Sequence, residues 1–255
     1  MNKIIAVANQ KGGVGKTTTA INLSAALAVK NRRVLLIDLD PQGMSTLGLA
    51  KPKENGKGVY QAMMIGRDLM DCIQGTELEN LYLCPCSPEL SGVEAELYAS
   101  ERRERRLSEA VEKARRYFNF IIIDCPPSLS MLTLNGLCAA HGVIIPMQCE
   151  YFAMEGLADL VNTIKRVAAN LNPDLRIIGL LRVMFDPRMT LQQQVSEQLV
   201  ARFGDKVFAT IIPRNVRLAE APSYGLPGVA YDRSSKGAQA YVAFGAEVIQ
   251  RLASM

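Results

Sequence analysis

The sequence has a single histidine and lacks any pair of cysteines in the Cys-x-x-Cys spacing. The lone His141 excludes Ser-His-Asp catalysis and metal sites built from histidines. Cys84 and Cys86 are too close together for the usual zinc half-site. We therefore expect the six cysteines to be reduced, partly buried thiols of a cytosolic protein; the alternative is a metal cluster that bridges two subunits. They are Cys72, Cys84, Cys86, Cys125, Cys138 and Cys149.

Long apolar runs are also missing, which excludes a transmembrane helix. The apolar residues 4–8 are too few for a signal peptide and lead directly into a glycine-rich loop, so we expect no export. With 49% hydrophobic and 21% charged residues, the composition is that of an ordinary soluble globule. The net charge of +4 permits a polyanionic partner without requiring one.

Short apolar runs alternate with helical patterns along most of the 255 residues. The runs predict strands over residues 3–8, 34–38, 120–124, 142–147, 176–183 and 207–211. Apolar residues at helical spacing predict helices over 17–30, 107–118 and 157–167, and residues 51–58 have the composition of a surface loop. The pattern indicates an α/β fold, a doubly wound, mostly parallel sheet with helices on both faces. We expect residues 1–255 to form one domain.

Residues 9–18 read Asn-Gln-Lys-Gly-Gly-Val-Gly-Lys-Thr-Thr and follow the first predicted strand. A strand, a glycine loop and a helix in succession are typical of nucleotide phosphate sites, because the loop amides close around the anion. Lys16 would supply a point charge and Thr17 would bind Mg²⁺. A dinucleotide site is excluded because Thr18 stands where its third glycine should be. The candidate phosphate-binding residues are Lys11, Gly12, Gly13, Val14, Gly15, Lys16, Thr17 and Thr18.

Acidic residues follow two other predicted strands. Asp38 and Asp40 end the second one, and Asp124 ends the strand over residues 120–124. Ligands of such sheets bind at the carboxyl ends of the strands, so these carboxylates should face the phosphate loop. An aspartate after an apolar strand reaches Mg²⁺ directly or through water in the Walker B arrangement. The combination predicts hydrolysis of ATP or GTP.

The strict phosphate-loop pattern has glycine at position 10, whereas this chain has Gln10 and then a second lysine, Lys11. With that leading lysine, the loop resembles the deviant Walker A P-loop NTPases, the family of ParA, MinD and the nitrogenase iron protein. Four further segments resemble its ParA/Soj branch, which partitions chromosomes and plasmids: residues 38–43, 123–128, 148–153 and 212–218. The resemblance extends over residues 2–253.

The resemblance implies a weakly active ATPase that uses ATP and Mg²⁺. Lys16 and the loop amides would bind the phosphates, and Thr17 would ligate Mg²⁺. Asp40 would position the attacking water near the metal, and Asp124 would support the metal, partly through water. Lys11 would reach the nucleotide of a second subunit in an ATP-sandwich homodimer; the alternative is a solvated loop lysine.

By the same resemblance, Pro213 and Asn215 would lie at the adenine. Three residues depart from the usual pattern of the family: Met44 replaces asparagine, His141 replaces an acidic residue, and Arg182 replaces a small polar one. These departures concern the loop after Asp40 and a surface expected near residue 182.

The resemblance also implies non-specific contacts to double-stranded DNA through Arg188, Arg217 and Lys236, with a ParB/Spo0J-like partner that triggers hydrolysis and release. The protein would be cytoplasmic and nucleoid-associated. Residues 174–251 hold ten basic and seven acidic residues, an excess that a solvated surface explains equally well. Residues 101–116 hold seven basic and four acidic residues, and we interpret them mainly as a packed helix with a solvated face; the alternative is a contact with DNA or a partner.

The alternative function is that of a MinD-like ATPase at the membrane surface. It requires a C-terminal amphipathic helix with several basic residues. Residues 246–255 contain one arginine, and we expect their apolar side chains to close the core, so no stable membrane anchor is predicted. No helix-turn-helix domain fits before Lys3, and we expect a partner to recognise specific DNA sequences.

Overall fold

The computed structural model describes residues 2–151 and 153–254, apart from the side chains of residues 153 and 155. Phe152 in the predicted 148–153 motif and Met255 lie outside the described residues. Eight strands form one sheet in the order β3-β4-β2-β5-β1-β6-β7-β8, and only β3 is antiparallel to its neighbour. The predicted fold class is confirmed. The six predicted strands are β1 (Lys3–Val7), β2 (Val34–Asp38), β5 (Phe120–Asp124), β6 (Gly142–Met147), β7 (Arg176–Phe185) and β8 (Val207–Pro213).

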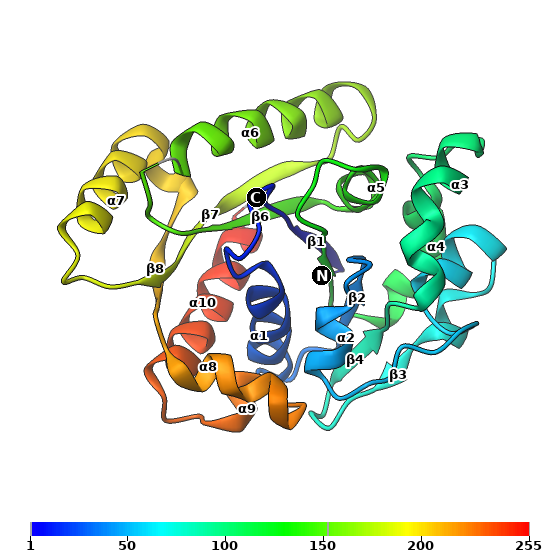
Figure 1. Cartoon of the computed structure of the whole chain (residues 1–255), viewed down its shortest axis with the longest axis horizontal. Coiled ribbons are helices and arrows are strands. Elements are labelled where there is room, and N and C mark those ends of the chain that lie inside the picture. The colour runs from blue at the N-terminus through cyan, green and yellow to red at the C-terminus, as the bar shows by residue number, and fades with distance from the viewer. Residues whose placement is uncertain (1, 152, 255) are drawn as a thin grey trace.

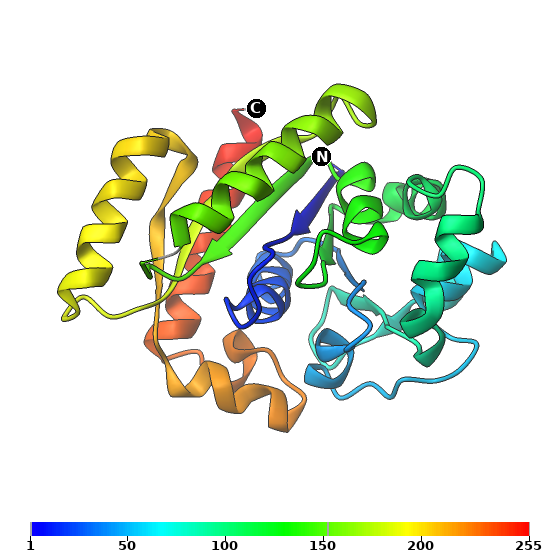
Figure 2. The same ribbon diagram turned by 45° about the horizontal axis from the view of Figure 1, so that its top comes forward.

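Helices cover both faces of the sheet (Figures 1 and 2). On one face α1 (Lys16–Ala28) and α10 (Lys236–Ala253) pack side by side. The other face carries α4 (Arg106–Ala114), α5 (Met131–Ala139), α6 (Ala153–Asn170) and α7 (Thr190–Phe203). The central strands are buried on both sides, which explains their continuous apolar runs. The shorter helices are α2 (Met44–Gly48), α3 (Val93–Ala99), α8 (Val216–Glu220) and α9 (Gly228–Tyr231).

Two strands were not predicted from the sequence. Strand β4 (Leu81–Cys84) lies beside β2, and β3 (Gln74–Gly75) forms the sheet edge. They have four and two residues, too few to produce a distinct apolar run. Other boundaries shift by a few residues; the basic stretch 101–116, for example, is helical only from Arg106, and its stripe Leu107, Val111 and Ala114 is buried.

The C-terminal helix α10 closes the core as predicted. Its Tyr241, Phe244, Val248 and Leu252 are buried against α1 and the sheet. Within the described residues, no helix is both long enough and apolar enough to span a bilayer. All six cysteines are free thiols, and only Cys138 is partly exposed.

The prediction that residue 182 lies at the surface is wrong, because Arg182 is buried between β7 and β8. Its guanidinium donates to the Ser196 hydroxyl at 2.8 Å and to the Phe208 carbonyl at 2.7 Å. The register of β7 and β8 shifts here, and the carboxylate of Glu247 accepts from the next two amides of β8. Side chains thus satisfy the backbone groups of an irregular edge strand. His141 also has a structural contact, since its Nδ1 accepts from a β1 amide at 2.9 Å.

Candidate nucleotide site

The glycine loop connects β1 to α1 at the carboxyl edge of the sheet. Gly13 and Gly15 both have a φ of 73°, in the left-handed region that favours glycine. Gly15 directly precedes α1, so the free amides of the first helical turn face the loop. Lys16 is buried, and its Nζ donates to the Lys11 carbonyl at 2.9 Å. The loop therefore folds around a buried ammonium at the positive end of a helix.

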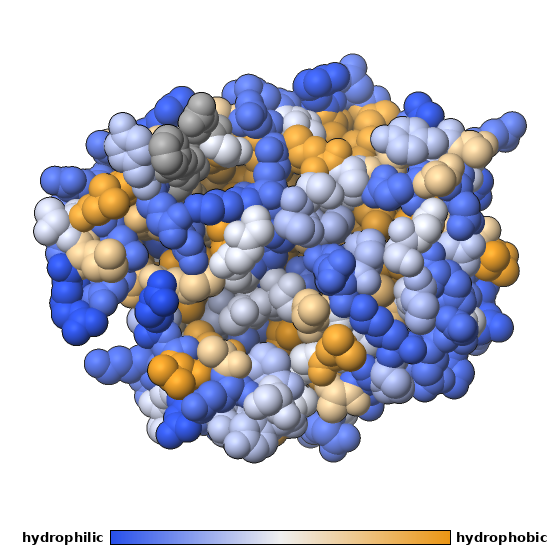
Figure 3. All heavy atoms as spheres, viewed as in Figure 1, coloured by the Kyte–Doolittle hydropathy of each residue, from blue (hydrophilic) through white to orange (hydrophobic). Residues whose placement is uncertain are grey.

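A cavity of about 580 Å³ opens beside this loop. It lies between the loop, α2 and the segment from α8 to α9. In the view of Figure 3 the middle of the molecular surface is of intermediate hydropathy. Among its lining residues are seven predicted ones: Gly12, Gly13, Gly15, Lys16, Thr17, Thr18 and Asp40. Val14 is buried, and Lys11 is exposed outside the cavity. A volume of this size accommodates a small-molecule ligand.

Pro213 and Asn215 line a neighbouring cavity of about 200 Å³. The two cavities share four wall residues: Gly15, Thr18, Met184 and Leu218. Asn215 also caps α8, because its Oδ1 accepts from the Leu218 amide at 3.3 Å. The predicted adenine residues thus lie next to the phosphate loop but outside the main cavity.

Two aspartates at the carboxyl ends of neighbouring strands have no solvent exposure. Asp38 and Asp124 are Cα partners on β2 and β5, and both are fully buried. Asp38 Oδ2 accepts from the amide and hydroxyl of Thr46 at 2.7 and 2.6 Å. Asp124 Oδ2 accepts from the Ser45 hydroxyl at 2.8 Å. The Oδ1 atom of each aspartate has no hydrogen-bond partner within the described part of the chain.

Burial changes the ionisation of this group of residues. It raises the pKa of Asp124 to about 8, and the nearby charge of Asp38 adds to that increase. Burial likewise raises the pKa of Asp38 to about 6, against the opposing hydrogen bonds from Thr46. It lowers the pKa of Lys16, although Asp124 and Asp40 act in the opposite direction. The positive charge near Asp38 and Asp124 is thus too small to keep both carboxylates ionised.

Asp40, unlike Asp38 and Asp124, lines the cavity. It is 8% exposed, and its Oδ1 accepts from the Gln42 amide at 2.9 Å. Gly43 then adopts a left-handed conformation and begins α2. Met44, one of the departures from the family pattern, is exposed on α2 and forms part of the wall.

Lys11 does not line the cavity and forms an ion pair with Glu150, which follows β6. Both side chains are about half exposed. The Lys11 amide is held by Asn9 Oδ1 at 3.0 Å, and Asn9 in turn donates to the Pro146 carbonyl at 2.8 Å. The backbone at Lys11 is therefore fixed, while its ammonium lies at the surface.

Asn22 is a wall residue that sequence reasoning missed. It is 3% exposed on α1; its Nδ2 donates to the Thr18 carbonyl at 2.9 Å, and its Oδ1 accepts from the Val229 amide at 3.2 Å. Asn22 thus links the phosphate-loop helix to α9. A polar residue among buried apolar ones in residues 17–30 was the available signal. Ser45 and Thr46 were also missing from the predicted site, whereas Asp38 was predicted to face the loop but was given no individual role.

The predicted DNA contacts lie outside both cavities. Arg188 follows β7, Arg217 lies on α8, and Lys236 begins α10; all three are exposed. Arg188 forms an ion pair with Asp186, and Arg217 forms one with Glu220. The structure brings these residues to the ends of the edge strand β8 and its neighbour β7, and to the start of α10.

Comparisons with known proteins identify the family. A family model described as an AAA domain matches residues 2–177. The chain is 50% identical to the sporulation initiation inhibitor protein Soj of Bacillus subtilis, over 97% of this chain and 98% of that protein. It is 48% identical to the chromosome partitioning protein ParA of Myxococcus xanthus, over 98% of this chain and 89% of that protein. The chain belongs to the ParA/Soj family of chromosome-partitioning ATPases.

A solved structure agrees with the ParA/Soj fold. The cobyrinic acid a,c-diamide synthase of Mycobacterium smegmatis superposes with a TM-score of 0.87 at 38% identity, covering 100% of this chain and 97% of that one. That protein was solved with a bound ATP analogue and magnesium. Among the described residues of our ParA/Soj protein, no cluster of three cysteine, histidine or acidic side chains could hold a metal ion by itself.

Proposed function

We propose that this ParA/Soj protein is an ATP-dependent switch for DNA partitioning, in which an ATP-sandwich dimer binds DNA and hydrolysis releases it. One observation carries the proposal: the glycine loop, Lys16, Thr17 and Asp40 line one cavity, with Asp124 directly behind it. This is the set of groups that phosphoryl transfer requires.

Lys16 and the loop amides would hold the phosphates in the cavity, with Pro213 and Asn215 at the adenine. The carboxylates fit a divalent cation, because Asp124 Oδ1 is buried and has no hydrogen-bond partner among the described residues. The pKa of Asp124 is also raised, and a nearby cation would lower it again. Thr17, Asp40 and Asp124 would hold Mg²⁺, partly through water. When bound, Mg²⁺ neutralises charge on the phosphates.

Asp40 would position the attacking water. It is the carboxylate at the cavity wall, whereas Asp38 and Asp124 are fully buried. The backbone around it is fixed by the Gln42 amide and by the turn into α2. Asp40 would therefore keep its orientation while α2, the neighbouring wall, responds to the nucleotide.

Lys11 would act across the dimer. Its ion pair with Glu150 is half exposed, and such pairs contribute only about 0–1 kcal/mol. A phosphate of a second subunit could therefore replace Glu150 at little cost. A cation supplied in trans to the phosphates accelerates hydrolysis by about 10³–10⁵ in related chemistry. Lys11 would thus make ATP hydrolysis depend on dimer formation.

The dimer would place two copies of Arg188, Arg217 and Lys236 against double-stranded DNA. Contacts to phosphates are independent of sequence and weaken steeply with salt. A ParB/Spo0J-like partner would recognise the cargo and stimulate hydrolysis. We accordingly propose a cytoplasmic protein associated with the nucleoid, in agreement with the burial of the apolar residues of α10 in the core.

DNA retention with ATP, with ADP and for Arg217→Glu tests this function. We expect binding with ATP, little with ADP, and at least a tenfold loss for Arg217→Glu, because charge reversal removes one phosphate contact per subunit and adds repulsion. Arg32→Glu is the matched control, since exposed Arg32 lies between α1 and β2, at the amino end of an interior strand. ATP-dependent retention that Arg217→Glu leaves unchanged would contradict the assignment of this surface.

A further inference from the structure

On the proposed DNA surface, Arg188 and Arg217 already form ion pairs with carboxylates of the same chain. Asp186, directly after β7, holds Arg188 with both oxygens: Oδ1 accepts from Nε at 2.9 Å and Oδ2 from Nη2 at 2.6 Å. Arg214 follows β8, where its amide donates to the Phe185 carbonyl at 3.3 Å. The hydrogen bonds from the side chain and amide of Arg188 lower the pKa of Asp186 to about 2, and the charges of Arg188 and Arg214 act in the same direction. Asp186 thus pairs with Arg188, and the backbone of Arg214, a residue not predicted as a DNA contact, is bonded to the residue before Asp186.

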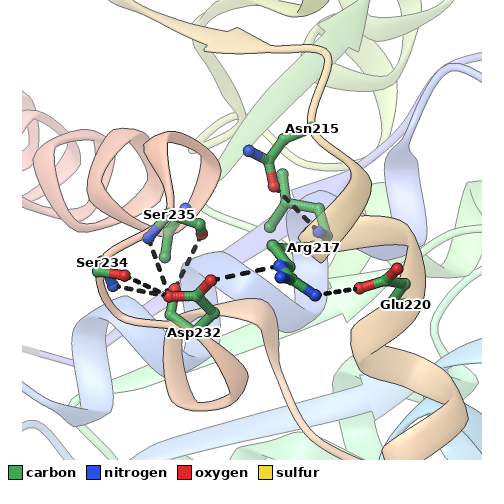
Figure 4. A network of polar contacts seen from close by, with 8 residues as sticks. Asn215, Arg217, Glu220, Asp232, Ser234 and Ser235 are labelled. Carbon is green, nitrogen blue, oxygen red and sulfur yellow. Dashed lines mark hydrogen bonds and ion pairs between the residues drawn. The ribbon is translucent and has the colours of Figure 1, made fainter.

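Arg217 is held in the same way from two sides (Figure 4). Its Nη1 lies 2.9 Å from Glu220 Oε2 on α8, and its Nε lies 3.5 Å from Asp232 Oδ2 just after α9. Asp232 is itself fixed, because its Oδ1 accepts from the amide and hydroxyl of Ser234 and from the Ser235 amide. Two carboxylates therefore face opposite sides of one guanidinium.

These contacts use the donor groups that would bind a nucleic acid phosphate. The planar fork of arginine matches carboxylate and phosphate alike, so both anions compete for one site. The pairs are open to solvent: the side chains of Arg188 and Arg217 are 87% and 53% exposed. In Figure 3 strongly hydrophilic side chains project at the left, around the turn before α7, whereas hydrophilic and hydrophobic side chains are mixed around α8 at the lower left. A phosphate could reach both arginines from this side.

We propose that Asp186, Glu220 and Asp232 are built-in competitors that weaken the affinity of this surface for DNA phosphates. The inference rests on the proposed DNA binding and adds how its strength is set. When a single subunit binds DNA, each arginine exchanges its carboxylate partner for a DNA phosphate, so little binding free energy is gained. In a dimer two such surfaces act on one DNA molecule, and their small gains combine. The carboxylates thereby keep binding dependent on the ATP-bound dimer.

The competitors can be neutralised without removing their structural contacts. Glu220→Gln is the simplest change, because the Glu220 carboxylate contacts only Arg217 among the described hydrogen bonds and ion pairs. Asp232→Asn keeps one oxygen for Ser234 and Ser235 while it replaces the oxygen that faces Arg217. Asp186→Asn keeps an acceptor for the Arg188 amide, which lies 3.0 Å from Oδ1.

The test is binding of the full chain to double-stranded DNA of random sequence, with ATP and with ADP, over a range of salt concentrations. Exposed ion pairs are weak, so each replacement should strengthen ATP-dependent binding about two- to fivefold. Each should also steepen the slope of log K against log salt by up to about 0.9 per freed phosphate contact. The triple variant should retain DNA with ADP, which the unaltered protein should not.

Glu79→Gln is the matched control. It removes the same charge from an exposed residue ahead of β4, at the opposite edge of the sheet, and should leave binding unchanged. If the unaltered protein binds DNA but none of the three replacements strengthens binding, the inference is overturned. An equal gain for Glu79→Gln would also overturn it, because net charge alone would then explain the effect. If neither the unaltered protein nor any variant binds DNA with ATP, the proposed function itself fails.

Discussion

Replacing Asp38 with asparagine should stabilise the nucleotide-free protein at neutral and alkaline pH. Asp38 has no exposed surface, lies beside Asp124 across β2 and β5, and leaves Oδ1 without a partner among the described residues. Asparagine keeps one oxygen for the two hydrogen bonds from Thr46 and removes the buried charge. The substitution therefore separates the effect of ionisation from that of packing.

The magnitude follows from the pKa of Asp38, which burial raises from 3.8 to about 6. Between these values the folded protein holds a proton that the unfolded chain releases, so the stability that this group contributes is complete below pH 3.8 and is lost as pH rises through about 6. At about 1.4 kcal/mol per pH unit, ionised Asp38 lowers the free energy of unfolding by about 3 kcal/mol at pH 7.5. Asp38→Asn should restore about that amount.

Urea denaturation at pH 4.5 and pH 7.5, without nucleotide or Mg²⁺, measures this difference. We expect the free energy of unfolding of the variant to exceed that of the unaltered protein by about 3 kcal/mol at pH 7.5 and by only about 1 kcal/mol at pH 4.5. Asp159→Asn, at an exposed position of α6, is the control and should show no such pH dependence. An offset of the same size at both pH values would refute the reasoning, because packing and not ionisation would then be its cause.

Three further substitutions test other parts of the site and fold. Lys11→Ala should leave the affinity of the monomer for ATP within about threefold, while the hydrolysis rate falls at least about a hundredfold, since the cation acts in trans. Asp40→Ala should retain ATP and slow its hydrolysis, measured by phosphate release, because the water loses its positioning group. Arg182→Ala should lower the free energy of unfolding by about 2–4 kcal/mol in urea titrations, since it leaves the Ser196 and Phe208 acceptors without their donor.

Each of these predictions has a comparison that could contradict it. Lys113→Ala, on the exposed face of α4, should hydrolyse ATP normally, and an equal loss there would remove the special role of Lys11. Rapid turnover by Asp40→Ala would exclude Asp40 as the residue that positions water. Arg182→Lys keeps the charge and should lose less stability than Arg182→Ala; equal losses would show that the hydrogen-bonding fork does not matter.

Local patterns in the sequence were sufficient to predict the loop and most of the sheet. A continuous apolar run such as β5 is a strand because both its faces are buried, and that signal is complete within five residues. The positions of Asp40 and Asp124 follow from the rule that parallel strands end at one edge. Strand β4 has only four residues and is identified by its pairing with β2, which the sequence does not display.

Side-chain partners were much less predictable, because they join residues far apart in the chain. Glu150 lies 139 residues from Lys11, and no local pattern connects them. Arg182 looked like a surface residue because its acceptors exist only where β7 and β8 shift register. The ion pairs of the predicted DNA-binding residues could not be predicted from the sequence either. Asp232, for example, contacts Arg217 only because α8 and α9 fold next to each other.

The central claim is that Lys11 makes ATP binding assemble two subunits. Light scattering of Asp40→Ala with ATP and Mg²⁺, with and without the additional Lys11→Ala change, tests it most directly. We expect twice the chain mass of 27.9 kDa for Asp40→Ala and the mass of one chain for the double variant. A double variant that binds ATP and still has the doubled mass would contradict the account.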